Sequence, residues 1–113
     1  MNAEELRDFV INTLDDMKGR EISCLYVSQI TTFTDYMIVV TGTSTRHVKS
    51  LADDVAKKVK DAGNTVIGME GQRQGEWVLI DLGDVIVHVM MEEVRKLYDL
   101  ESLWGMKPSE SDG

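Results

Sequence analysis

The stretch that decides the fold is "WVLIDLGDVIVHVM", Trp77 to Met90. Both halves are rich in aliphatic and β-branched residues, and the Gly83–Asp84 pair between them suits a tight hairpin turn. With these two at the centre of the turn, strand parity places six aliphatic side chains on one face: Val78, Ile80, Leu82, Val85, Val87 and Val89. We therefore predict an antiparallel hairpin whose aliphatic face lies in the core.

The opposite face of this hairpin has a mixed character. In the same register it carries Trp77, Leu79 and Asp81 opposite Met90, His88 and Ile86. Trp and Met are enriched at protein interfaces, and a half-polar face is typical of a surface that meets another molecule. The pattern predicts that one face of the hairpin is core and the other a docking surface.

The rest of the chain alternates helical and strand patterns. We expect a helix over 2–17, with an Asn2–Glu5 capping box and an end at Gly19, and a second after "TGTS", capped by Thr43 or Ser44 and ended by Gly63. Strands are expected over 21–27, 36–42 and 65–69 and a last helix over 92–105. The order α-β-β-α-β-β-β-α predicts a single α/β domain over 1–105, with a mixed five-stranded sheet flanked by helices and a disordered tail over 106–113.

Charge narrows the class of partner. Twenty acids against twelve bases give a net charge of −8 over 113 residues, and residues 70–101 alone hold eight acids and three bases. The negative electrostatic field of these acids favours a basic protein surface as the binding partner over bare nucleic acid. An alternative is that the acids serve only solubility. No apolar run is long enough for a membrane span, and the acidic N-terminus does not resemble a signal peptide, so we expect a cytoplasmic protein without sequence-specific nucleic-acid binding.

Catalysis and metal binding have weaker support. Asp81, Asp84 and His88 invite an acid–base interpretation, but Asp84 suits a turn and a histidine at an interface or with its hydrogen bonds satisfied is commoner than a general base. The Gly42–Ser44 loop precedes a helix and invites a phosphate, yet no Walker lysine follows. His47 and His88 lie in different predicted elements, so we expect no metal site and no cofactor.

Three long runs carry a resemblance to a known family. They are "DFVINTLDDMKG", "TDYMIVVTGTSTRHVKSLADDV" and "MEGQRQGEWVLIDLGDVIVHVMMEEVRKLYDLESLW". Together they resemble the ribosomal silencing factor family, also called RsfS or Iojap, from about residue 4 to Trp104. The resemblance implies a nucleotidyltransferase-like fold in a protein that is not an enzyme. The carboxylate pair that would hold Mg²⁺ in that fold is missing here, where "VIVHVM" offers a histidine instead.

The resemblance also implies a function and a set of contact residues. Family members bind the large ribosomal subunit through its fourteenth protein, sterically block joining of the small subunit and lower translation when nutrients are scarce; they tend to form homodimers. By position, the partner-binding surface would include Trp77 and Leu82, and we extend it to Asp81, Asp84 and Tyr98. The hairpin register and the resemblance differ at Leu82, because the register places its side chain in the core. There we follow the resemblance and expect Leu82 at the rim of the surface.

Two other functions stay open on sequence grounds. One is a minimal nucleotidyltransferase-like enzyme that binds a nucleotide at the Gly42–Ser44 loop and uses Asp35. The other is an acidic adaptor with no ribosomal role.

Overall fold

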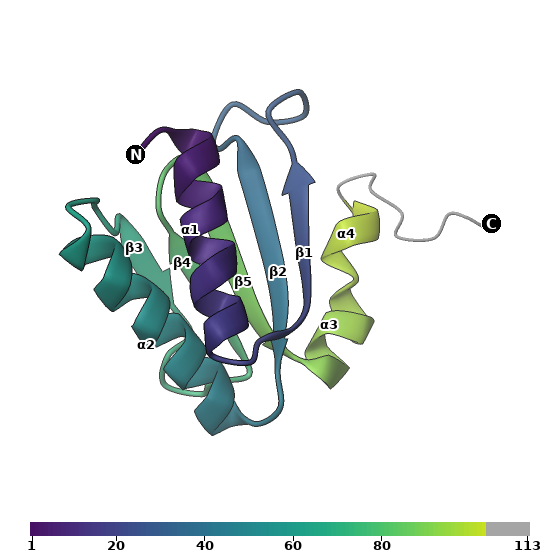
Figure 1. The fold of residues 1–113 in the computed structure, drawn as a ribbon. Helices are drawn as coiled ribbons and strands as arrows, with labels where there is room; N and C mark the ends of the chain where they lie inside the picture. The colour runs from purple at the N-terminus through teal and green to yellow at the C-terminus, as the bar shows by residue number, and fades with distance from the viewer. Residues whose placement is uncertain (104–113) are drawn as a thin grey trace.

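A computed structural model describes residues 1–103 and shows a mixed five-stranded sheet flanked by helices (Figure 1). The elements are α1 (Ala3–Asp16), β1 (Arg20–Tyr26), β2 (Tyr36–Gly42), α2 (Thr45–Asp61), β3 (Gly68–Glu70), β4 (Trp77–Asp81), β5 (Val85–Met91), α3 (Glu92–Tyr98) and α4 (Leu100–Leu103). The strand order is β1-β2-β5-β4-β3, in which β2 and β5 run parallel and the other neighbours antiparallel. The predicted fold class is confirmed. The predicted boundary at 105 and the predicted tail over 106–113 lie outside the described residues.

The β4–β5 hairpin has the register that strand parity predicts. Trp77 pairs with Met90, Leu79 with His88 and Asp81 with Ile86. The Leu82 N–H donates to the Val85 carbonyl at 2.9 Å and closes the turn, in which Gly83 takes a φ of 88°. The six aliphatic side chains of the predicted core face are all buried.

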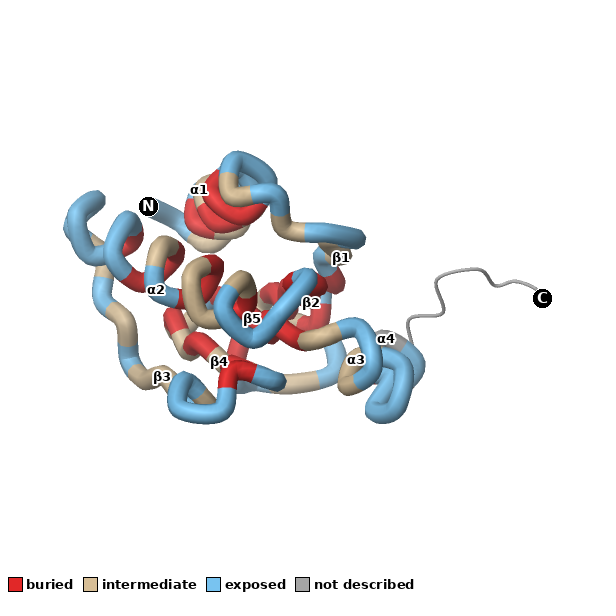
Figure 2. The backbone as a smooth tube through the Cα atoms, turned by 90° about the horizontal axis from the view of Figure 1, so that it is seen from below, coloured by how far each residue is buried: buried red, intermediate tan, exposed pale blue. Residues whose placement is uncertain are grey.

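The main core lies between this face of the sheet and helices α1 and α2 (Figures 1 and 2). Helix α2 contributes an apolar stripe in which every residue has 0% exposure: Val48, Leu51, Ala52, Val55 and Val59. The Ser44 hydroxyl, not that of Thr43, caps α2 by accepting from the His47 N–H at 3.1 Å. Asn2 and Glu5 form the predicted capping box of α1.

Besides shifts of one residue, element boundaries differ from the prediction in three places. The left-handed residue after α1 is Lys18 (φ 64°) and not Gly19, and β3 is only three residues long. The expected helix over 92–105 is broken at Asp99, which takes the left-handed conformation (φ 46°, ψ 58°). Aspartate tolerates this conformation better than most residues. The break directs Leu100 into a second apolar cluster, described next, where Leu100 is 8% exposed.

That second cluster lies on the other face of the sheet, under α3 and α4. It comprises Leu25, Val27, Met37, Val39, Met90 and Leu100, with Trp77 and Val94 packed against it. His88 points to the same face, because it is two residues from Met90, and is 8% exposed. Burial lowers the pKa of His88 from 6.5 to about 4, since a charged imidazolium would lose its hydration there.

Gly42 is required by the packing of α2 on β2. A Cβ at Gly42 would lie 2.7 Å from Val48 Cγ2 and 3.0 Å from the Val48 backbone nitrogen, whereas a Cβ at Gly68 would meet nothing within 4 Å. We expect Gly42→Ala to lower the free energy of unfolding by about 1–3 kcal/mol because the helix must move away from the strand. The matched control, Gly68→Ala, should change it by less than about 0.5 kcal/mol. Urea denaturation measures both; equal effects would contradict this packing.

The buried His88 predicts a specific pH dependence of stability. Because its folded pKa (about 4) lies below the unfolded value of 6.5, the unfolded chain takes up a proton between these pH values that the folded chain does not. The contribution of His88 to the free energy of unfolding is therefore fully present above pH 6.5. It falls as the pH is lowered towards 4, by up to about 3 kcal/mol. Unfolding free energies measured from pH 8 to pH 4 should show this component in the wild type and not in His88→Leu. An identical pH profile for the two proteins would show that His88 does not titrate in this way.

Candidate functional site

Three rings meet on the face of the sheet that carries α3 and α4: Trp77 at the start of β4, His88 in β5 and Tyr98 at the end of α3. The Trp77 Nε1–H donates to His88 Nδ1 at 3.0 Å, and the two ring centres are 5.9 Å apart. The Tyr98 ring lies 4.9 Å from that of Trp77 at an interplanar angle of 49°, and Tyr98 is 54% exposed. Two of the predicted contact residues, Trp77 and Tyr98, are therefore brought together from separate elements into one aromatic cluster.

Backbone contacts hold Trp77 at this position. The Met91 N–H donates to the Glu76 carbonyl at 2.9 Å, which extends the pairing of β4 and β5 beyond Trp77. Gly71 approaches so closely that a Cβ there would lie 2.1 Å from the Trp77 carbonyl oxygen, and its φ is 90°. Only glycine fits both conditions, so the loop before β4 depends on Gly71.

Tyr98 is placed by an anchor that sequence reasoning missed. Helix α3 has no buried residue of its own, but Arg95 Nη1 donates to the Glu21 carbonyl at 2.6 Å and to Thr41 Oγ1 at 2.9 Å. These bonds tie α3 to the first two strands of the sheet. No local pattern signals them, because the partners are 74 and 54 residues away in the chain.

The acidic residues lie at the other end of the hairpin. Four residues along a strand place Asp81 about 13 Å from Trp77. Asp81 is half-buried, and its Oδ1 accepts from the Gly83 N–H at 2.9 Å, so the carboxylate also serves the turn. Asp84 is exposed, and its carbonyl accepts from the N–H groups of Asp35 and Tyr36. Asp84 thus presents a carboxylate to solvent from a rigidly held turn.

Leu82 does not lie at the surface. It is 6% exposed and belongs to the main core cluster. Strand parity predicts this position, and the expectation that Leu82 reaches the rim is corrected: as the residue before the turn it still points to the aliphatic face. Leu79 and Ile86, which parity places on the mixed face but which were not among the five predicted contact residues, are half-buried between its aromatic and acidic ends.

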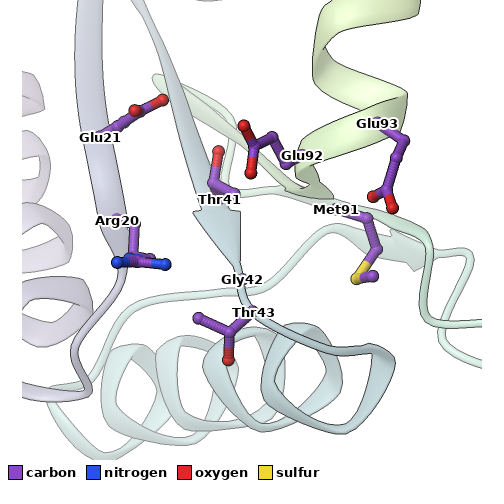
Figure 3. Close-up of a pocket in the computed structure, with 8 residues that line it drawn as sticks. All are labelled: Arg20, Glu21, Thr41, Gly42, Thr43, Met91, Glu92 and Glu93. Carbon is purple, nitrogen blue, oxygen red and sulfur yellow. The ribbon is translucent and has the colours of Figure 1, made fainter.

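A separate hollow of about 690 Å³ lies where the parallel strands β2 and β5 end (Figure 3). It is lined by Arg20, Glu21, Thr41, Gly42, Thr43, Met91, Glu92 and Glu93. Three glutamates would repel the phosphates of a nucleotide, and Gly42 is already required by Val48. Asp35 precedes β2 whereas Gly42 ends it, so the seven-residue strand separates them by roughly 20 Å. The nucleotide-binding alternative needs both residues in one place, and the fold keeps them apart.

Two further kinds of feature are absent from residues 1–103. Within that range no group of three or more His, Cys, Asp or Glu side chains is arranged to hold a metal ion. No helix in the same part of the chain is both long and apolar enough to cross a membrane.

Comparisons with known proteins identify the family. The family model described as "Ribosomal silencing factor during starvation" (RsfS) matches residues 1–112. The "Ribosomal silencing factor RsfS" of Chromobacterium violaceum is 49% identical over 110 residues, covering 96% of this chain and 90% of that protein. The protein of the same name from Haemophilus influenzae is 41% identical over 99 residues, covering 88% and 97%.

Structural and more distant comparisons agree with this. A crystal structure of a protein from Chromobacterium violaceum is similar with a TM-score of 0.92 and 48% identity, covering 100% of this chain and 95% of that one. A mouse protein named "Mitochondrial assembly of ribosomal large subunit protein 1" is 29% identical over 103 residues, covering 88% of this chain and 45% of that protein. On the family match, the identities and the shared fold together, this chain belongs to the RsfS family of ribosomal silencing factors.

Proposed function

We propose that this chain is a translational repressor that binds the large ribosomal subunit through that subunit's fourteenth protein. Bound there, it would sterically block joining of the small subunit and so lower translation under nutrient limitation. The family membership supports a silencing role, and the name of the mouse relative connects a similar protein with the large subunit. It acts by occlusion and not by catalysis, in the cytoplasm, and forms a homodimer.

The observation that carries this proposal is the aromatic cluster of Trp77 and Tyr98 on an acidic hairpin. Large aromatic side chains that are part-buried in their own protein and open to solvent on one side are frequent binding hot spots. At the other end of the hairpin, Asp84 and the half-buried Asp81 supply negative charge. Residues 70–101, with eight acids and three bases, provide the field that attracts a basic protein surface.

Each of the five predicted residues has a distinct part in this proposal. Trp77 and Tyr98 supply the apolar contact, and Asp84 faces basic groups of the partner. Asp81 contributes charge while it holds the turn through the Gly83 N–H. Leu82 acts from within the core, by fixing the shape of the turn that presents Asp84.

Removal of the Trp77 side chain should weaken binding strongly. We expect Trp77→Ala to weaken the affinity for purified large subunits by about 30-fold or more, because a hot-spot aromatic typically contributes about 2 kcal/mol or more. Co-sedimentation with large subunits measures the effect, and circular dichroism confirms that the variant is folded. Tyr98→Ala should reduce binding in the same direction.

The control for this experiment is Asn12→Ala. Asn12 is exposed on α1, which covers the opposite face of the sheet from Trp77. It should bind as the wild type does. Normal co-sedimentation of a folded Trp77→Ala protein would refute the proposed surface.

Reversal of the exposed turn charge should change the rate of association. Asp84→Lys is expected to lower the association rate constant at low ionic strength and to flatten its dependence on salt, since long-range attraction acts mainly on the encounter. Asp53→Lys makes the same change in net charge on an exposed position of α2, on the other face of the sheet, and should have a smaller effect. Equal rates for Asp84→Lys and the wild type at low salt would argue against electrostatic docking.

A further inference from the structure

His88 occupies an unusual place for a histidine. It lies on a strand inside the sheet, with β2 on one side and β4 on the other, and it is 8% exposed. Its neighbours on the same face include Met90, Val39 and Leu79, which are apolar. A leucine or methionine would fill such a position without the cost of burying two ring nitrogens. The histidine therefore calls for a reason other than packing.

The reason lies in its contact with Trp77. Since Trp77 pairs with Met90 and His88 pairs with Leu79, the two rings are diagonal neighbours on the same face of the hairpin. The indole N–H points at His88 Nδ1, with 3.0 Å between the nitrogens. An Nδ1 that accepts this bond carries no proton, so the imidazole is neutral and its proton is on Nε2.

We propose that His88 is a positioning residue of the docking surface: it accepts the indole N–H and thereby fixes the orientation in which Trp77 meets the partner. This inference rests on the proposed function, and it adds a residue that does not itself need to touch the ribosome. Tyr98 packs on the indole from α3, so the ring is held from two elements. A side chain that is already ordered loses less conformational entropy when it binds, which favours affinity.

Two substitutions at His88 separate positioning from packing. His88→Asn places an oxygen acceptor on the δ1 atom, where Nδ1 is in the histidine, whereas His88→Leu fills similar space with no acceptor. We expect His88→Leu to bind large subunits about two- to tenfold more weakly, as the loss of one hydrogen bond predicts. His88→Asn should stay within about twofold of the wild type, even if both variants are less stable than the wild type in urea.

A double-mutant cycle tests whether His88 acts through the indole. Trp77→Phe keeps an aromatic ring and removes the N–H donor, so His88→Leu should cause no further loss of affinity in the Trp77→Phe background. A loss of the same size in both backgrounds would mean that His88 acts by packing alone, and it would overturn the proposal. Wild-type affinity in a folded His88→Leu protein would overturn it as well.

The free protein offers a readout that does not depend on the ribosome. In ¹H–¹⁵N spectra the Trp77 indole resonance, assigned with the help of a Trp104→Phe variant, should move in His88→Leu and keep its position in His88→Asn. If the wild type fails to bind large subunits, the proposed function fails, and this resonance alone decides whether His88 orients Trp77. An indole resonance that is the same in the wild type and in His88→Leu would overturn the positioning.

Discussion

Alternation of side chains along β4 and β5 is the constraint on which the rest of the structure depends. Six aliphatic side chains must face the core under α1 and α2, and this requirement holds the hairpin in one register. Once that face is buried, the other is determined: Trp77 and His88 share it with Asp81, about 13 Å away along the strand. A slip of one residue would exchange the faces of one strand and disperse the docking surface. Core packing and the proposed function are therefore two consequences of one pairing.

The same constraint explains how far the sequence alone could lead. Strand parity predicts the hairpin register, the buried position of Leu82 and the mixed face, because these depend on a two-residue period. It cannot predict the break at Asp99, since a helical pattern continues through a residue in the left-handed conformation. Arg95 was missed because its acceptors are Thr41 and the Glu21 carbonyl, distant in sequence. The contact between Trp77 and His88 depends on which nitrogen faces the indole, and no spacing encodes that.

The features that first suggested chemistry serve the architecture. Gly42 allows Val48 of α2 to approach β2, and Asp81 accepts a hydrogen bond from the backbone of the turn. Asp35 lies near that turn, because its N–H donates to the Asp84 carbonyl, and so it is far from the hollow beside Gly42. What remains for function is a surface on one face of the sheet. Such a surface suits a protein that binds another macromolecule, and the chain belongs to a family of ribosomal silencing factors.

The most direct test of this account is sedimentation of purified ribosomal subunits in sucrose gradients, with and without the protein, under conditions that favour subunit joining. The account predicts that preincubation of large subunits with the protein leaves large and small subunits in separate peaks, and that the protein migrates with the large subunit. Undiminished formation of the joined ribosome, at protein concentrations that saturate the large subunit, would contradict it.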